Sequence, residues 1–406
     1  MDHRILTTGI AALAALTSIP PCASGADFGD DIAFLKKHTG VIVLSDKAGM
    51  AKVVLAPAWQ GRVMTSTTGG DAGLSFGWIN RELIASGEIK PHMNAFGGED
   101  RFWMGPEGGQ FSIFFERGKK FEFADWQTPA VFDTKPFKVV SKADDRAVFS
   151  QEFSLTNYSG TVFHVAVERE VRLLSPGTAW EKLGVKPAGD LSLVAYASNN
   201  KITNKGREAW KKETGLLSVW ILGMFNPSPS TTVVVPIKAG PEKDLGVKVT
   251  SDYFGQVPAD RLVVRDDVVF LRADGQYRSK IGIGPKRSKA ILGSYDADNK
   301  VLTLVQFNQP EGVTDYVNSL WKLQDNPFGG DAANSYNDGP PEPGARPMGP
   351  FYELESSSPA AALEPGGSLT HTHRTFHLTG PEAALDKIAK ATLGVSLGDV
   401  RAVFRK

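Results

Sequence analysis

Short runs of β-branched and aromatic residues recur along almost the whole chain, and they constrain its fold more than any other feature. Such runs occupy residues 111–116 (FSIFFE), 231–237 (TTVVVPI) and 300–308 (KVLTLVQFN), and turn-forming residues bound them. Residues 161–174 alternate apolar and polar side chains, the pattern of a half-buried strand. Because helices do not alternate with these strands, their spacing predicts an antiparallel all-β sandwich or barrel.

One helix is predicted near the C-terminus, over residues 381–394. Pro381 suits the first turn of a helix, Gly394 suits its end, and apolar residues such as Leu385 and Ile388 recur on one face. No sequence repeat with a period of about 20 to 50 residues is visible, which disfavours propellers and solenoids. We therefore expect residues 27–406 to form one β domain, with this helix packed on its outside.

The first residues have the layout of a secretory signal peptide. Arg4 precedes the apolar run at residues 5–19, and small residues follow, so we expect cleavage after Ala26. The run is too short to cross a bilayer comfortably. Cys22, the only cysteine, allows lipid anchoring as an alternative, which the two prolines before it disfavour. We expect a periplasmic or secreted protein without disulfides.

The charges of the chain balance, with 45 Lys and Arg residues against 45 Asp and Glu residues among 406. This balance argues against nucleic-acid binding, which needs a surplus of basic side chains to displace counterions from phosphates. The hydrophobic content of 41% is sufficient for a large core. No later segment is apolar enough to cross a membrane. We therefore expect a globular monomer.

Residues 97–110 (GGEDRFWMGPEGGQ) gather planar side chains around permissive glycine backbone, in a loop that feeds a strand. Trp103 offers a flat apolar face. The polar side chains that accompany it are Glu99, Arg101, Glu107 and Gln110. An aromatic face beside forked hydrogen-bonding groups suits a sugar ring. A structural turn, with Trp103 in the core, explains the same residues equally well.

Two C-terminal segments combine carboxylates with imidazoles. In an extended chain, Glu353 and Glu355 point to one face, roughly 6.5–7 Å apart. In the strand predicted at residues 368–380, His371 and His373 share a face with His377. If the two strands are neighbours, imidazole and carboxylate come within reach for general acid–base chemistry, with His371 as the acid and His373 as a sugar ligand. Solvated carboxylates and structural histidines are the simpler alternative.

Residues 325–350 lack periodicity and form a loop too long for an ordinary hairpin, so we expect it to contribute to function. Asn337 and Asp338 are its candidate sugar ligands. Its oxygen-bearing side chains also allow calcium, although their spacing matches no known calcium loop: Asp331, Asn334, Asn337 and Asp338. Zinc is disfavoured because the His-x-His pair has no third ligand at a recognisable spacing. We expect no metal or other cofactor.

These stretches together resemble the galactose mutarotase-like (aldose epimerase-like) superfamily, and more narrowly an uncharacterised secreted bacterial branch. The resemblance rests on residues 97–115, 278–296 and 329–367, the last of which ends in the turn LEPGG before the final strand. It would cover nearly all of residues 40–400. It implies a β-supersandwich of large antiparallel sheets, whose concave face holds a mono- or oligosaccharide.

The resemblance also implies a catalytic glutamate, which matches Glu355 or Glu353. The first family histidine falls where this chain has Gly97 and Gly98, and the element nearest to the second, residues 198–206, contains no histidine. Three hypotheses therefore stay open. The protein is a mutarotase-type isomerase with a Glu base, a glycoside-cleaving enzyme with a carboxylate pair about 6.5–9.5 Å apart, or a non-catalytic carbohydrate-binding protein.

Overall fold

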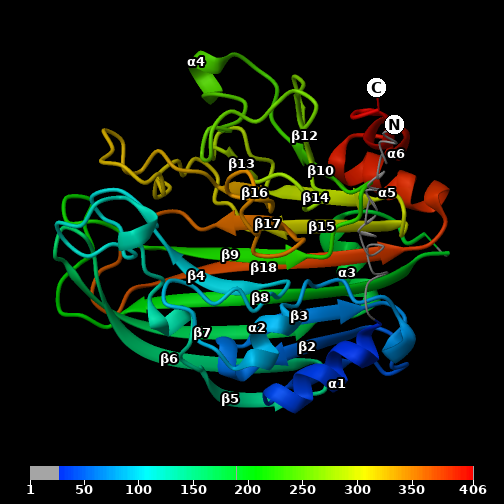
Figure 1. Ribbon diagram of the computed structural model, residues 1–406, viewed down its shortest axis with the longest axis horizontal. Helices are drawn as coiled ribbons and strands as arrows, with labels where there is room; N and C mark the ends of the chain where they lie inside the picture. Colours follow the sequence, from blue (N-terminus) through cyan, green and yellow to red (C-terminus); the bar gives the residue numbers. More distant parts are fainter. Residues whose placement is uncertain (1–26, 189, 406) are drawn as a thin grey trace, which may run out of the picture.

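A computed structural model describes residues 27–188 and 190–405, so the predicted signal peptide lies outside the described residues. Antiparallel strands in three sheets dominate these ranges, and the helices are few and short (Figure 1). The all-β architecture predicted from the strand spacing is thereby confirmed.

The largest sheet has ten strands in the order β11-β12-β10-β14-β15-β18-β8-β7-β6-β5. Their bounds are β5 (Lys138–Ala143), β6 (Arg146–Thr156), β7 (Val162–Leu173), β8 (Ser192–Asn204), β10 (Thr232–Pro236), β11 (Leu262–Val264), β12 (Val268–Arg272), β14 (Ile291–Asp296), β15 (Val301–Phe307) and β18 (Ser368–Thr379). Burial alternates along β7, so this part of the sheet has one face in the core and one in solvent.

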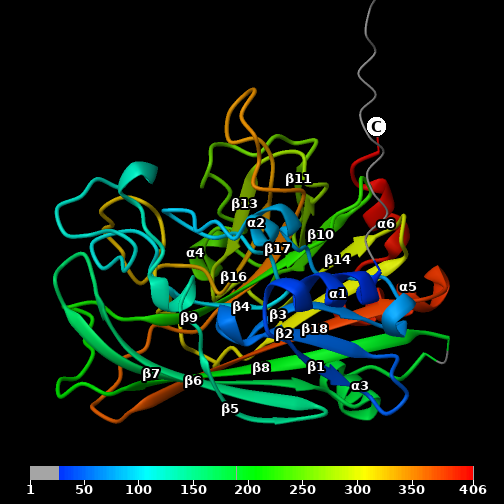
Figure 2. The same cartoon turned by 60° about the horizontal axis from the view of Figure 1, so that its bottom comes forward.

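The second sheet has five strands in the order β13-β16-β17-β9-β4. Their bounds are β4 (Arg101–Gly105), β9 (Ser218–Phe225), β13 (Ser279–Ile283), β16 (Ala333–Asn337) and β17 (Tyr352–Ser357). One face packs on the ten-stranded sheet, where Leu354 and Ile281 share a core cluster with Val305. Figure 2 shows β4, β9, β16 and β17 stacked over β5–β8. The strands of this sheet are buried on both faces, because loops cover the side that points away from the ten-stranded sheet.

The third sheet consists of β1 (Ile42–Ser45), β2 (Lys52–Ala56) and β3 (Arg62–Thr67). The helix α1 (Phe28–His38) packs on it through Phe28 and Leu35. The side chain of Asp27 caps this helix. The helix carries acidic residues in its first turn and basic residues in its last turn, an arrangement that interacts favourably with the helix dipole. This helix was not predicted from the sequence.

Most of the remaining helices pack on a sheet or on another helix. They are α2 (Arg81–Ser86), α3 (Pro176–Leu183), α4 (Glu242–Leu245), α5 (Glu382–Leu393) and α6 (Leu397–Ala402). The predicted C-terminal helix is confirmed as α5, with Pro381 before it and Gly394 in a left-handed conformation after it. Its apolar face packs with α3 and α6 on the ten-stranded sheet.

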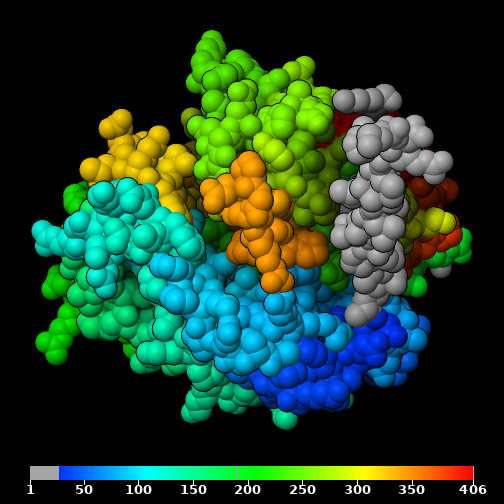
Figure 3. All heavy atoms as spheres, in the orientation of Figure 1, coloured from blue at the N-terminus to red at the C-terminus, as the bar shows by residue number. Residues whose placement is uncertain are grey.

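Three local expectations were wrong. Residues 111–116 are a loop rather than a strand: Phe114 and Phe115 bury their rings in an aromatic cluster, and their backbone pairing is limited to an isolated bridge between Phe115 and Trp126. Residues 97–110 are not a loop throughout, since β4 runs through their centre. Residues 325–350 contain β16; residues 325–332 precede it as a loop, and residues 339–350 form the segment that connects it to β17. This segment lies on the surface between the blue and the green parts of the chain (orange in Figure 3).

Candidate functional site

The two predicted glutamates lie on the side of the five-stranded sheet that points away from the ten-stranded sheet, called the outer face below. Tyr352 and Ser356 contact side chains of the ten-stranded sheet, Ser294 and the histidines of β18. Because side chains alternate along a strand, Glu353 and Glu355 point the opposite way. Register places Lys280, Tyr336 and Met224 in line with Glu353. The predicted shared face of the two glutamates is thus observed.

Glu355 is fully buried, yet only one of its carboxylate oxygens has a hydrogen-bond partner among the described residues. Oε2 accepts a hydrogen bond from Trp220 Nε1 at 2.8 Å and one from Lys280 Nζ at 3.1 Å. Oε1 is equally buried and has no partner in the part of the chain that the structure describes. A buried acceptor without a donor costs free energy unless a ligand or water supplies one.

Lys280 is the central cation of this face. Its ammonium lies 4.7 Å from the Trp220 ring centroid and 5.7 Å from that of Tyr253, within cation–π range. Burial alone would lower the pKa of Lys280, but Glu355, Glu107 and Glu353 outweigh burial and raise it. The side chain therefore stays charged at neutral pH, which excludes a neutral amine nucleophile.

Glu353 is paired with Arg101, which reaches it from β4 across β9. Burial raises the pKa of Glu353 to about 7, the charge of Arg101 opposes this shift, and the negative charge of Glu355 adds to it. Both side chains of the pair are nearly inaccessible. Glu355 is less accessible still, so the two glutamates are distinguished by their partners and not by their exposure.

Glu107 is the third carboxyl group of this region and follows β4 in the chain. Its backbone N–H donates to Ser319 Oγ at 3.1 Å, which fixes the loop. Burial raises the pKa of its side chain to about 7; Lys280 opposes the shift and Glu355 increases it. Trp321 and Trp126 lie against the carboxyl and oppose the shift further. A carboxyl group with this pKa can donate a proton near neutral pH.

We call Arg101, Glu107, Trp220, Lys280, Glu353 and Glu355 the outer-face cluster. Four of these six residues were predicted from the sequence, whereas Trp220 and Lys280 were not. Lys280 is a single charge within the otherwise small and apolar strand SKIGI, and that signal could have identified it. Trp220 lies in a strand that is apolar on both faces, so the sequence contains no comparable signal.

Trp103 is a core residue, so the expectation of an open stacking face was wrong. It is 4% exposed, and its ring packs against those of Phe114, Trp126 and Trp220, with centroids 5.3, 6.4 and 5.7 Å away. The structural alternative for this residue therefore describes it correctly. Gln110 is also engaged, because its amide exchanges two hydrogen bonds with the backbone of Gln324.

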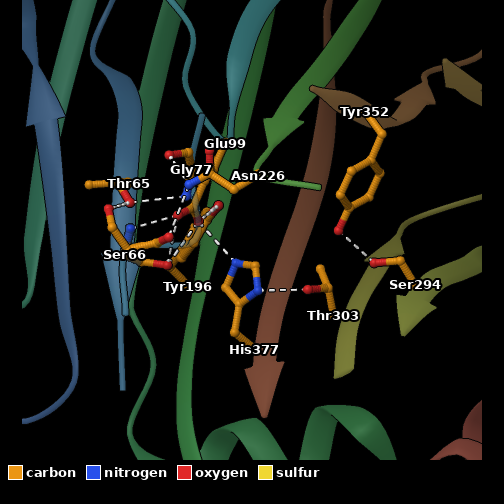
Figure 4. A network of polar contacts seen from close by, with 11 residues as sticks. Thr65, Ser66, Gly77, Glu99, Tyr196, Asn226, Ser294, Thr303, Tyr352 and His377 are labelled. Atoms are coloured by element: carbon orange, nitrogen blue, oxygen red, sulfur yellow. Dashed lines mark hydrogen bonds and ion pairs between the residues drawn. The ribbon is translucent and has the colours of Figure 1, made fainter. Parts of the chain in front are cut away.

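Glu99 lies in the interior, away from the outer-face cluster, and so offers no contact to a sugar. Its carboxylate accepts hydrogen bonds from the backbone and hydroxyl of Ser66, from Tyr196 OH at 2.8 Å and from His377 Nε2 at 3.0 Å (Figure 4). Thr303 holds the other nitrogen of the His377 ring at 2.9 Å. This network joins β3, β8, β15 and β18.

His371 and His373 do not meet the glutamates, which corrects the predicted imidazole–carboxylate pair. Both rings lie 2.8 Å from Ser356 Oγ, on the face of β17 opposite to Glu353 and Glu355. Burial lowers the pKa of His371 to about 3 and that of His373 to about 4. β18 belongs to the ten-stranded sheet and β17 to the five-stranded sheet. The histidines of β18 approach β17 from the side of Ser356, so the backbone of β17 lies between the imidazoles and the two carboxylates. His371 cannot be the acid for Glu355.

Asn337 and Asp338 serve the backbone rather than a ligand. Asn337 Oδ1 accepts from the N–H of Gly275, and Asp338 accepts from Tyr336 OH and from the N–H of Gly349, each at 2.8 to 2.9 Å. These bonds hold the ends of the 339–350 segment. Arg346 in this segment pairs with Glu82 of α2.

The oxygen-bearing residues considered for calcium do not converge. Asn334 and Asn337 alternate to opposite faces of β16, and Asp331 is bonded to Tyr253 and near Asn334. Within the described ranges no three or more His, Cys, Asp or Glu side chains are arranged to hold a metal ion.

The sequence profile of a family of unknown function (DUF6786) matches residues 26–404. A search of the curated proteins found no match. Among the described residues, no helix combines the length and the apolar character that a membrane span requires.

Several solved structures are similar over most of the chain. A protein of Synechocystis sp. PCC 6803 is 14% identical with a TM-score of 0.48, covering 84% of this chain and 96% of its own. An Escherichia coli protein described provisionally as an aldose 1-epimerase is 13% identical with a TM-score of 0.49, covering 84% and 99%. A galactose mutarotase-like protein from Lactobacillus casei is 11% identical with a TM-score of 0.46, covering 83% and 100%.

Proposed function

The chain belongs to the DUF6786 family, and we propose that it is an exported carbohydrate-active protein whose outer-face cluster binds a sugar. One observation carries this proposal. Among the described residues, Glu355 Oε1 is a buried acceptor without a donor, in a cluster with tryptophan, lysine and two further carboxyl groups. A sugar supplies hydroxyl donors for the carboxylate and a C–H face for the indoles. The sequence motifs shared with the galactose mutarotase-like superfamily support the same ligand class.

The reaction that fits these groups best is the opening and closing of a sugar ring. Glu355 takes the proton of the anomeric hydroxyl, the bond between C1 and the ring oxygen breaks, and the ring oxygen takes a proton from Glu107. Closure on the other face of the aldehyde, with both proton transfers reversed, gives the other anomer. Glu107 thus replaces His371 as the acid, because its pKa of about 7 keeps part of it protonated at neutral pH.

Glycoside cleavage is the second candidate, and one observation favours it. Glu107 comes from the loop after β4 whereas Glu355 comes from β17, so the two carboxyl groups approach from different elements. Such a pair can flank a glycosidic bond, which two residues of one strand rarely do. The predicted pair of Glu353 and Glu355 is less suitable, because Arg101 binds Glu353.

The test is to follow anomer equilibration of a panel of sugars by polarimetry with the purified protein. Glu355→Gln keeps the size of the side chain and removes the base, so the rate should fall by roughly 10²–10⁴-fold. Glu353→Gln is the matched control and should retain more activity. Full turnover in both variants would refute the assignment. Release of reducing ends would favour glycoside cleavage, and saturable binding without reaction would favour a binding protein.

Export rests on the order of basic, apolar and small residues before Ala26. The intact mass of the protein from its native host should correspond to a chain that begins at Asp27. A mature chain that retains Met1, or one with a lipid on Cys22, would contradict this proposal.

A further inference from the structure

The outer-face cluster and its surroundings contain more carboxyl groups than cations. Glu355 is paired with Lys280, and Arg101 with Glu353. The charges of Glu355 and Lys280 act on three further carboxyl groups, Glu107, Asp331 and Glu353, so the region holds four carboxyl groups and two cations. At the rim, Asp338 and Arg278 add one charge of each sign. With every group ionised, the region carries an excess of two negative charges.

Each of these cations already has a partner. Arg101 is bound to Glu353, and Lys280 is bound to Glu355 between the rings of Trp220 and Tyr253. The guanidinium of Arg278 lies 3.9 Å from the Phe254 ring centroid at the rim. A ligand anion would have to displace one of these contacts, whereas a ligand donor finds Glu355 Oε1 free among the residues described.

We infer that this site selects its sugar by charge: it takes a sugar that brings hydrogen-bond donors, favours one that carries an amine, and rejects uronates and sugar phosphates. The inference rests on the proposed function and narrows its substrate class. A like charge brought into a water-poor site is repelled strongly, because the local dielectric screens it weakly. A sugar ammonium group would instead donate to Glu355 Oε1 and be attracted by Glu107.

The experiment compares sugars that differ only in charge. Glucose, glucosamine and glucuronate form one trio, and galactose, galactosamine and galacturonate form another. Thermal stabilisation of the wild-type protein gives a first ranking, and titration calorimetry gives the affinities. We expect the amine to bind at least as tightly as the neutral sugar, and the uronate at least about tenfold more weakly than the neutral sugar.

A charge-neutral variant shows whether the carboxyl groups cause the ranking. Glu107→Gln removes one negative charge. The ratio of the affinities for the neutral sugar and the uronate should therefore become measurably smaller in this variant. Glu116→Gln, nine positions later and exposed, is the matched control and should leave the gap unchanged.

The wild type alone provides a second readout if Glu107→Gln does not fold. Lowering the pH from about 8 to about 5.5 protonates Glu107 and Glu353 but leaves a uronate ionised. The charged groups that face Glu107 are Lys280 and Glu355, and those that face Glu353 are Arg101, Glu355, Lys280 and Asp338. Discrimination against the uronate should therefore shrink at the lower pH.

The outcomes separate this inference from the proposed function. Binding of neutral and amine sugars with rejection of uronates supports both. If uronates or sugar phosphates bind as tightly as their neutral parents, charge selection is refuted while a sugar site stands. If no sugar of any charge binds, the proposed function fails and the inference fails with it.

Discussion

Two buried glutamates of this protein differ in how completely their oxygens are satisfied. Glu99 and Glu355 are both fully inaccessible. Both oxygens of Glu99 accept hydrogen bonds, from Ser66, Tyr196 and His377, whereas only one oxygen of Glu355 does so among the residues described. A fully satisfied buried carboxylate makes the fold specific, and a half-satisfied one indicates where a ligand completes the site.

The location of each glutamate agrees with this difference. The Glu99 network connects β3 of the three-stranded sheet to β8 and β18 of the ten-stranded sheet (Figure 4). The outer-face cluster lies on the opposite side of the five-stranded sheet from the ten-stranded sheet, under loops. Lys280 and Glu107 are half-buried there, so solvent or a ligand can reach the edge of the cluster.

The largest effect is expected for Glu99→Ala. The substitution leaves the Ser66 backbone N–H, Tyr196 OH and the His377 ring without their partner, so it should lower the free energy of unfolding by about 3–5 kcal/mol. Chemical denaturation measures this loss. Glu116→Ala, at an exposed position, is the control and should stay within about 0.5 kcal/mol. A loss below about 1 kcal/mol for Glu99→Ala would show that the network does not hold the sheets together.

The fold and part of the site could be predicted from the sequence, and there is a physical reason why the rest of the site could not. Alternation of apolar and polar residues predicted strands such as β7, because one face of that strand meets solvent. The same rule placed Glu353 and Glu355 on one face correctly. It could not show that the histidines of β18 point into the space between two sheets, where a hydroxyl, that of Ser356, satisfies both rings.

The sequence did not show how deeply each of these side chains is buried. Glu99 and Glu107 lie in one short stretch and have the same side chain, yet one enters the interior and the other reaches the outer face. Which of them does so depends on β4, whose pairing with β9 is set by residues more than a hundred positions away. For the same reason, the sequence left open whether Trp103 faces a ligand or packs in the core.

An intermediate effect is expected for the dependence of stability on pH. Burial raises the pKa of Glu107 from its usual 4.5 to about 7. Between these values the folded protein keeps a proton that the unfolded chain releases, so the free energy of unfolding falls as the pH rises through this window. Glu107→Gln should remove this part of the slope, on the order of 2–3 kcal/mol between about pH 4.5 and 7.

The buried histidines between the two sheets make the free energy of unfolding change with pH in the opposite direction. Burial lowers the pKa of His371 and His373 to about 3 and about 4 from 6.5. The unfolded chain therefore binds protons that the folded protein does not, and stability is lost as the pH falls through this range. Unfolding curves at several pH values should show the histidine slope unchanged in Glu107→Gln. An identical pH profile in wild type and variant would contradict the raised pKa of Glu107.

The smallest change in stability is expected for Glu355→Gln, and the same substitution at Glu99 is its matched comparison. At Glu355, the amide of Gln keeps one oxygen for Trp220 and Lys280 and places its NH₂ group where no protein donor points, among the described residues. The free energy of unfolding should therefore change by less than about 1 kcal/mol. At Glu99, the NH₂ group faces the donors of Ser66 or Tyr196 whichever way the amide turns, so Glu99→Gln should cost more. Denaturation of the two variants side by side measures the difference. Equal losses would mean that Glu355 is held as tightly as Glu99, and that the outer-face cluster is part of the scaffold instead of a site that awaits a ligand.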